Sequence, residues 1–164
     1  MHRYLLSLGS NIGDRKQNLL LAVKEIAKLL RNCEVSSIYQ SQALLPFDFD
    51  VKWDMPYLNM CVVGYSELSP HDFLSKMQHI EKALGKEINA LTWSPRTIDI
   101  DILLVDQLIS NLDHLRLPHP GLLVRDFFLI PASEIWPDAT HPIIKASLIN
   151  IRPTILTQLK KYED

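Results

Sequence analysis

The chain has 164 residues, of which 47% are hydrophobic and 22% charged, as is typical of a globular domain with its own core. Seventeen Lys and Arg residues against 19 Asp and Glu residues leave a net charge of -2, which argues against a general nucleic-acid binder. No apolar run approaches the ~20 residues of a membrane-spanning helix, and the apolar N-terminal stretch is too short for a signal peptide. Cys33 and Cys61 lie outside any CxxC pattern and predict buried free thiols. We therefore expect one cytoplasmic domain over residues 1–164, monomeric and bound to neither membrane nor nucleic acid.

The first half of the chain alternates between strand and helix patterns. Three segments have the apolar or β-branched composition of strands, and they cover residues 3–8, 34–40 and 57–66. Between the first two, residues 18–30 predict a helix, with Asp14 placed to cap it. Its expected apolar stripe is Leu20, Val23, Ile26, Ala27 and Leu30. Residues 41–56 contain Pro46 and Pro56 and predict a loop.

The second half predicts a helix, a strand and a further helix. Residues 70–84 have helical spacing, and Ser69 and Gly85 are placed to cap and to end this helix. The other expected segments are a polar loop over 86–96, a strand over 97–105, a hairpin arm over 107–117 and a helix over about 122–135. The order βαββαβ indicates an α+β, ferredoxin-like fold, in which an antiparallel sheet carries helices on one face and leaves the other face for a site. Residues 138–164 are added C-terminal elements, which predict a covering helix that Pro153 begins or interrupts.

Two aspartates stand two positions apart in the sequence TIDIDIL of the last predicted strand. Alternate residues of a strand point to the same side, so Asp99 and Asp101 project together, about 6–7 Å apart at ~3.3 Å of rise per residue. The isoleucines that then face the core are Ile98, Ile100 and Ile102. Two carboxylates held this close favour a hard cation such as Mg²⁺, which takes one or two carboxylates, waters and phosphate oxygens. The alternative is an exposed face with two solvated aspartates.

Basic residues lie on both sides of this strand in the sequence. Arg96 precedes it, and His119 and Arg125 follow it. A guanidinium fork suits phosphate, although each residue alone is typical of a surface charge, and only their convergence near the aspartates would make an anion site. Gln78 and Glu81, about one helical turn apart, either reach the same site or are solvated. Neither GxxxxGK[ST] nor GxGxxG occurs, so a nucleotide would bind by another route.

Aromatic and amide side chains form a second set of candidates. Tyr57 and Asn59 share one face of a predicted strand, where a ring that stacks and a carboxamide that hydrogen-bonds suit a flat heterocycle. Trp93 lies in a polar loop, which favours a lid or a site wall. Phe127 is compatible with a pocket wall or with core packing.

Taken together, these segments resemble the 6-hydroxymethyl-7,8-dihydropterin pyrophosphokinase family of folate biosynthesis. The matching segments occur in family order and are LSLGSNIGDRKQNL (6–19), PYLN (56–59), IEKALG (80–85), WSPRTIDIDILL (93–104), LPHP (117–120) and RDFFLIPASEIWP (125–137). The pattern PRTIDID, followed by PH and then R-x-F, is highly specific. The resemblance implies a ferredoxin-like fold with added elements, which agrees with the order of the predicted elements.

The resemblance also implies a reaction and a set of site residues. Members of the family transfer the β,γ-diphosphate of ATP to the pterin's hydroxymethyl oxygen, release AMP and use two Mg²⁺ ions. Asp99 and Asp101 match the metal ligands and, with Arg96, the catalytic residues. Positions that match the nucleotide side are Gln78, Glu81, Arg96, Ile102, His114, His119 and Arg125. Positions that match the pterin pocket are Tyr57, Asn59, Trp93 and Phe127, of which the first and last are expected to sandwich the ring.

Three departures from the family pattern bear on activity. Lys86 and Ile88 stand where many members carry Arg-x-Arg in a mobile loop, and neither side chain offers a guanidinium fork. Ser41 and Gln42 replace a Thr-Pro pair, and the 44–55 loop is longer and more acidic than usual. We therefore expect slower chemistry, with a divergent paralogue for another pterin and a weakly active pterin- or nucleotide-binding protein as alternatives. A ferredoxin-like RNA-binding domain is disfavoured, because an RNP1-like motif is absent and the net charge is -2.

Overall fold

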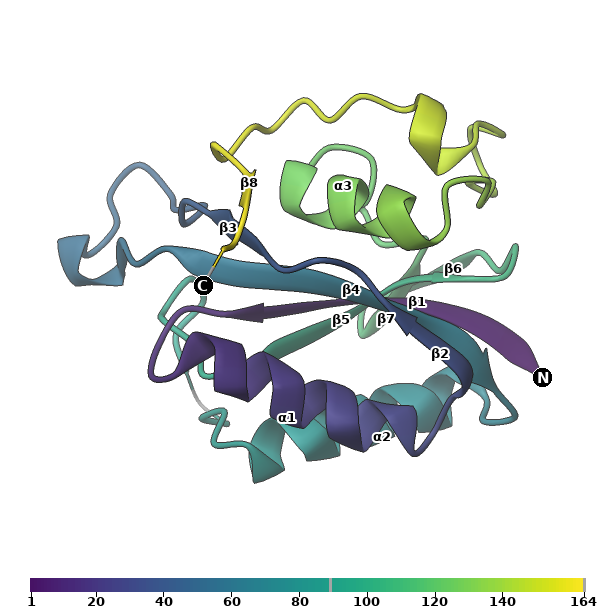
Figure 1. Ribbon diagram of the computed structural model, residues 1–164, viewed down its shortest axis with the longest axis horizontal. Coiled ribbons are helices and arrows are strands. Elements are labelled where there is room, and N and C mark those ends of the chain that lie inside the picture. Colours follow the sequence, from purple (N-terminus) through teal and green to yellow (C-terminus); the bar gives the residue numbers. More distant parts are fainter. Residues whose placement is uncertain (89, 164) are drawn as a thin grey trace.

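The computed structural model describes residues 1–88 and 90–163, which form an antiparallel sheet between two layers of helix (Figure 1). The strands of the main sheet are β1 (His2–Ser10), β2 (Arg31–Val35), β3 (Tyr39–Ser41), β4 (Tyr57–Ser66), β5 (Asp99–Val105) and β8 (Lys160–Lys161). The other elements are α1 (Arg15–Ala27), η1 (Val51–Trp53), α2 (Pro70–Ala83), the hairpin β6 (Ser110–Leu112) and β7 (Leu115–Leu117), α3 (Asp126–Ile135) and η2 (Leu148–Asn150). The strand order is β5-β1-β4-β3-β8, with β2 also paired to β4. The predicted ferredoxin-like arrangement is confirmed.

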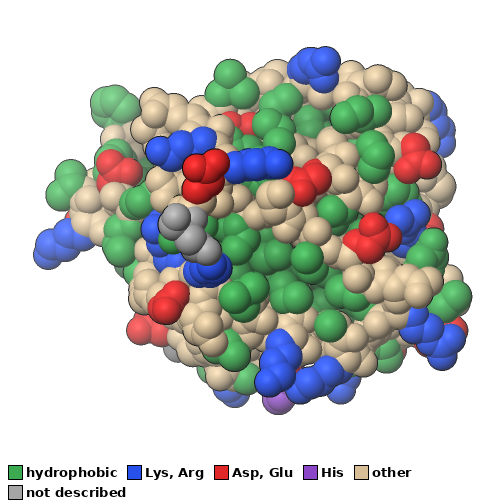
Figure 2. Space-filling model, viewed as in Figure 1, with side chains coloured by type: hydrophobic (Ala, Val, Ile, Leu, Met, Phe, Trp, Pro, Cys, Tyr) green, Lys and Arg blue, Asp and Glu red, His purple; other side chains and the backbone are tan. Residues whose placement is uncertain are grey.

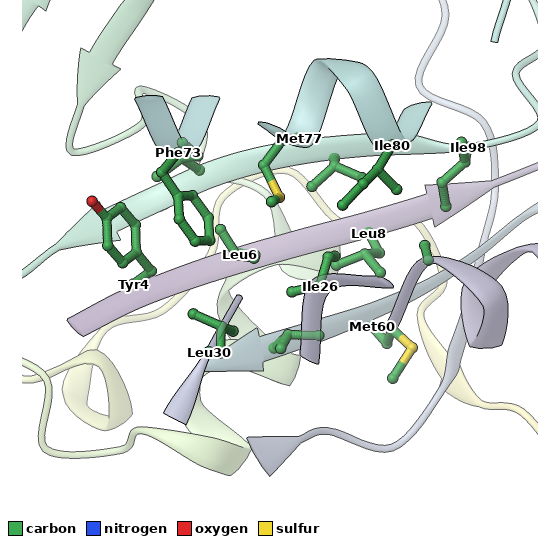
Figure 3. Packing of buried hydrophobic residues seen from close by; sticks show 14 of the residues in the cluster. Tyr4, Leu6, Leu8, Ile26, Leu30, Met60, Phe73, Met77, Ile80 and Ile98 are labelled. Carbon is green, nitrogen blue, oxygen red and sulfur yellow. The ribbon is translucent and has the colours of Figure 1, made fainter. Parts of the chain in front are cut away.

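Helices α1 and α2 cover one face of the sheet, where the larger hydrophobic core lies (Figures 1 and 3). The side chains of Asp14 and Ser69 cap these two helices, as predicted. Tyr4 of β1 stacks on Phe73 of α2 with ring centroids 4.0 Å apart, and both side chains are fully buried. The core therefore fixes both helices against the central strands.

The buried face of α1 differs from the predicted stripe by a rotation of the helix. Leu19, Ala22 and Ile26 are buried, whereas Leu20 and Ala27, which we expected in the core, are exposed. The run of three leucines is compatible with two different apolar stripes. The cap fixes where the helix begins, and packing on β1 and β4 selects the stripe that is buried.

The strands agree with the sequence pattern except at the sheet edge. The strand predicted over 34–40 is divided into β2 and β3, because Ser36 turns its hydroxyl inward to accept the backbone N–H of Cys61 at 2.8 Å. In and just before β5, the three isoleucines of TIDIDIL are buried in the core that α1 and α2 cover. Asp99 and Asp101 therefore lie on the opposite face, as predicted.

That opposite face is not free, contrary to the expectation. Helix α3 lies across it and buries a second hydrophobic core (Figure 1). The core residues contributed by the sheet are Leu5, Cys61, Val63, Leu103 and Leu104. Because α3 covers only one part of the face, the remainder is left open beside the N-terminal end of this helix, where Asp126 begins it.

The C-terminal segment forms an extended strap, so the covering helix predicted over 138–164 is wrong. Apart from the short turn η2, the strap runs over α3 and ends as β8 beside β3 (Figure 1). Pro153 has no N–H to donate, and Ile155 donates instead to the carbonyl of Val124 at 2.7 Å. Backbone pairing with two separate parts of the fold therefore replaces internal helical bonds.

The surface carries charges of both signs, in agreement with the net charge of -2. On the face drawn in Figure 2, basic and acidic side chains are interspersed around a hydrophobic area over the sheet edge between α3 and α1. Cys33 and Cys61 form no disulfide. Within the described part of the chain, no helix has the length and apolar character required to cross a membrane.

Candidate active site

A cavity of about 210 Å³ lies on the open part of the α3-covered face. Its lining residues come from β1, β3, β4 and β5, the start of α3 and two loops. They are Ser7, Gly9, Ser41, Gln42, Leu44, Tyr57, Asn59, Thr92, Trp93, Arg96, Asp99, Asp101, Arg125, Phe127 and Phe128. All four residues predicted for the heterocycle pocket are among them. A Cβ atom at Gly9 would lie 3.5 Å from side-chain atoms of both Tyr57 and Asn59. The absence of a side chain at Gly9 therefore leaves space at the floor of the cavity.

The amide of Asn59 is held in one orientation inside this cavity. The side chain is buried, and its Nδ2 donates to Ser41 Oγ at 2.9 Å. The amide oxygen then faces the Gly9 side of the floor. Ser41 was not predicted as a site residue, although it occupies a position where the family commonly has Thr. The bond presents a fixed pattern of hydrogen-bonding groups to a ligand.

The loop that carries Trp93 forms another wall. Trp93 lines the cavity, is 41% exposed and has a φ of 73°, in the left-handed region that non-glycine residues seldom adopt. Tyr57 remains a neutral phenol, because burial and then the charge of Asp99 raise its pKa. Aromatic walls around a fixed amide suit a flat, polar ring.

Asp99 is held in a network of charges. Lys86 Nζ donates to Asp99 Oδ1 at 2.6 Å and to Glu81 Oε1 at 2.8 Å, while Arg96 approaches Asp99 Oδ1 at 3.3 Å. Burial opposes ionisation of Asp99, but the two cations outweigh it and lower its pKa. Lys86 was not predicted to contact the aspartates, since sequence reasoning treated it only as a replaced arginine. The Lys86 ammonium therefore occupies the carboxylate that the sequence predicts as a metal ligand.

Asp101 behaves in the opposite way. Burial, followed by the negative charges of Asp99 and Glu81, raises its pKa to about 7. Its side chain is nevertheless 36% exposed, toward the cavities that it lines. A cation placed between the two carboxylates would offset the like charge that contributes to the raised pKa of Asp101.

A second cavity of about 380 Å³ adjoins the first. It is lined by Leu74, Ile100, Asp101, Ile102, Asp113, His114, Leu115, Arg116, His119, Pro120, Gly121 and Arg125. Asp101 and Arg125 line both cavities and therefore form their shared wall. Of the residues predicted for the nucleotide side, Ile102, His114, His119 and Arg125 line this second cavity. Arg116 lines it as well and was not predicted, because an isolated exposed arginine carries no sequence signal.

His119 points a ring N–H toward the shared wall. Its Nδ1 accepts the backbone N–H of Gly121 at 2.9 Å, and its Nε2 lies 3.9 Å from Asp101 Oδ1. Burial and the nearby Arg125 lower the pKa of the imidazole to about 4, so the ring is neutral at pH 7. With Nδ1 as the acceptor, the proton of the neutral ring is on Nε2.

Three predicted nucleotide residues lie outside the second cavity. Arg96 lines the first cavity instead. Gln78 is exposed on α2 and lines neither cavity. Glu81 also lines neither, and the alternative of a solvated side chain is wrong, because it is buried and accepts the N–H of Ile100 at 2.7 Å. Glu81 therefore supports the strand that carries the aspartates.

The donor set suits a metal that brings ligands of its own. Among residues 1–88 and 90–163, no three His, Cys, Asp or Glu side chains converge into a closed metal site. Mg²⁺ is commonly held by one or two carboxylates, with waters and substrate phosphates completing its octahedron. Asp99 and Asp101 fit this requirement, provided that the Lys86 ammonium leaves Asp99.

Comparisons with known proteins identify the family of the chain. Residues 5–137 match the family model described as 7,8-dihydro-6-hydroxymethylpterin-pyrophosphokinase. A 2-amino-4-hydroxy-6-hydroxymethyldihydropteridine pyrophosphokinase of Aquifex aeolicus is 36% identical over 148 residues, covering 90% of this chain and 89% of its own. A protein of the same name from a Synechocystis species is 35% identical over 153 residues, covering 92% of this chain and 74% of its own.

Longer proteins match over part of their length. The folate synthesis bifunctional protein of Chlamydia caviae is 36% identical over 133 residues, and the chain spans only 30% of it. A solved Plasmodium falciparum HPPK-DHPS with pterin and p-hydroxybenzoate superposes with a TM-score of 0.68 at 13% identity, over 90% of this chain and 42% of that one, which supports the fold alone. By its family-model match and its full-length relatives, the chain belongs to the 7,8-dihydro-6-hydroxymethylpterin-pyrophosphokinase family.

Proposed function

We propose that this protein transfers pyrophosphate from ATP to the hydroxymethyl group of 6-hydroxymethyl-7,8-dihydropterin and releases AMP, as a step of folate synthesis. Membership of the family supports the reaction. The observation that carries the proposal is the pair of adjoining cavities with Asp101 and Arg125 as their shared wall. One cavity suits a flat heterocycle and the other an anion, so the acceptor and the donor would meet at these two side chains.

The first cavity is the proposed pterin pocket. Tyr57 and Phe127 would sandwich the ring, Asn59 would hydrogen-bond its edge, and Trp93 would close the loop side. Since Ser41 fixes the Asn59 amide, the pocket would prefer one arrangement of donors and acceptors on the ring. This would place the hydroxymethyl group toward the aspartates.

The second cavity is the proposed ATP site. Ile102 and Leu74 provide an apolar surface, while His114, His119 and Arg125 provide hydrogen-bond donors for the nucleotide and its phosphates. Gln78 and Glu81 line neither cavity, so for Glu81 we propose a supporting role beneath the β5 backbone. Arg96, close to Asp99 in the first cavity, would contact the phosphates where the two cavities meet.

Asp99 and Asp101 are the proposed ligands of two Mg²⁺ ions, which would offset phosphate charge and polarise the attacked phosphorus. The pterin oxygen would attack the β-phosphorus, and the bond from this phosphorus to the oxygen that bridges to the α-phosphorus would break. The chain's own contribution is position and charge. The two guanidinium groups and the His119 Nε2–H would stabilise the negative charge that accumulates, and the cavity walls would hold the reactants in line.

We propose a monomer as the active unit. The two unpaired thiols support a reducing, cytoplasmic compartment. A binding protein of low activity is the second candidate, because Ile88 is 76% exposed and uncharged and Lys86 is engaged with Asp99.

The test is AMP formation from ATP and Mg²⁺ with and without the pterin, in the wild type and in Asp101→Asn. AMP that requires the pterin and is at least a hundredfold slower in the variant supports the proposal. Pterin binding by calorimetry without AMP would favour the binding protein. AMP formed equally without the pterin would refute both.

A further inference from the structure

The C-terminal strap lies beyond the part of the chain that the family model matches, yet it joins two walls of the first cavity. In Figure 1 the strap passes over α3 and descends beside β3. At one end it pairs with the residues that precede α3, through a bridge between Arg125 and Ile155. At the other end it pairs with β3, opposite Tyr39 and Gln40.

Thr157 is the point at which the two walls are tied together. Its backbone N–H donates to Asp126 Oδ2 at 2.6 Å, and its hydroxyl donates to Asp126 Oδ1 at 2.7 Å. Its carbonyl accepts the N–H of Gln42 at 2.9 Å. Asp126 and Thr157 are 2% and 4% exposed, so these bonds are shielded from competing water.

Both partners stand next to residues of the cavity. Asp126 lies between Arg125 and Phe127, which line the side formed by α3. Gln42 lines the side formed by β3 and follows Ser41, which holds the Asn59 amide. Asp126 and Thr157 themselves do not line the cavity.

We infer that Asp126 and Thr157 are positioning residues for the heterocycle pocket. Their paired hydrogen bonds set the separation between the Phe127 wall and the wall that carries Ser41 and Asn59. This inference rests on the proposed function, because it assigns the pocket to the pterin. Most of the second cavity comes from β5, the β6–β7 hairpin, α2 and the turn at His119, which Thr157 does not contact; Arg125, next to Asp126, is the residue that both cavities share with this region. The paired hydrogen bonds between Asp126 and Thr157, which we call the clamp, therefore act mainly on pterin affinity and little on ATP affinity.

The experiment compares Thr157→Val with Thr157→Ser and with Thr154→Val. The valine removes the hydroxyl at constant shape and leaves one oxygen of the buried carboxylate without a donor. Serine restores the donor. Thr154 is exposed on the same strap and donates its backbone N–H to the carbonyl of Val124, so replacing its side chain is the matched control. Affinities for the pterin and for Mg²⁺-ATP are measured separately by calorimetry, and thermal unfolding reports folding.

We expect Thr157→Val to weaken pterin binding about tenfold and to change ATP binding less than twofold. Thr157→Ser should bind the pterin as the wild type does, and Thr154→Val should change neither affinity. Unchanged pterin affinity in Thr157→Val, an equal loss for both ligands, or a serine variant that stays weak would each overturn the inference.

Asp126→Asn serves as a second variant, since it keeps the volume of the side chain but cannot accept at both positions. It should shift pterin affinity in the same direction, and pterin affinity equal to the wild type would contradict the clamp even if Thr157→Val fails to fold. A wild-type protein that binds the pterin without forming AMP refutes the proposed function but leaves the positioning role intact. A wild-type protein that binds no pterin refutes both.

Discussion

Replacing Lys86 by Met tests the charge network of the site, because this ammonium bridges Glu81 and Asp99. Unit charges 2.6 Å apart attract by roughly 6 kcal/mol at an effective dielectric constant of about 20, before desolvation is subtracted. Loss of one partner from a fully buried pair costs about 3–5 kcal/mol, whereas exposed pairs contribute about 0–1 kcal/mol. The Lys86, Glu81 and Asp99 side chains are 21%, 9% and 33% exposed, which places this network between these limits.

We therefore expect Lys86→Met to lower the free energy of unfolding by about 2 kcal/mol, or Tm by roughly 4–8 °C for a domain of this size. Because the lowered pKa of Asp99 reflects this cation, the stabilisation is present above the carboxyl's unfolded pKa and is lost as the pH falls through its folded pKa. The same variant should bind Mn²⁺ more tightly, since Asp99 no longer carries an ammonium.

Urea unfolding at pH 7 and Mn²⁺ titration by electron paramagnetic resonance measure the two effects. Lys82→Met is the matched control, because Lys82 is exposed near the end of α2, four residues before Lys86, and its replacement should change neither quantity. A Lys86→Met variant as stable as the wild type, or one that binds Mn²⁺ more weakly, would refute the reasoning.

Three further predictions concern the same site. Ser41→Ala should raise the KM for the pterin about fivefold with little change in kcat, because the Asn59 amide loses its hydrogen-bond partner. A lower kcat in steady-state kinetics would show instead that this bond acts on the chemical step. The folded protein keeps a proton on Asp101 up to about pH 7, whereas the unfolded chain releases it near pH 4. The free energy of unfolding therefore falls as the pH rises through 7. Asp101→Asn should accordingly stabilise the metal-free protein at pH 8 more than at pH 5 in urea unfolding, and an equal effect at both values would contradict the shift. Lys86→Arg combined with Ile88→Arg should raise kcat more than it changes ATP affinity. Single-turnover rates equal to the wild type would show that the missing arginines do not limit the reaction.

The parts of the fold that depend on local chemistry could be predicted from the sequence. Helix caps at Asp14 and Ser69 were found because a short polar side chain before an apolar period has one favoured use. The orientation of Asp99 and Asp101 followed from strand periodicity, which is insensitive to the rest of the fold. The segments that carry the family resemblance include most of the cavity lining.

Features that depend on distant contacts could not be predicted. The three leucines of α1 allow two stripes, and only packing on the sheet makes Leu19 the buried one. The strap around Thr157 has apolar residues at helical intervals, but its backbone finds partners near Val124 and Gln42 instead. Glu81 has an exposed-looking sequence context, and its burial follows from the N–H of Ile100 that it accepts across the core.

The most direct test of the central claim is the identity of the products in a single turnover. Enzyme in excess over 6-hydroxymethyl-7,8-dihydropterin is mixed with Mg²⁺-ATP, quenched and analysed by ³¹P NMR and mass spectrometry, with Asp99→Ala as the comparison. The account predicts equal amounts of AMP and pterin diphosphate in the wild type and neither product in the variant on the same timescale. ADP with a pterin monophosphate, or full activity in Asp99→Ala, would contradict it.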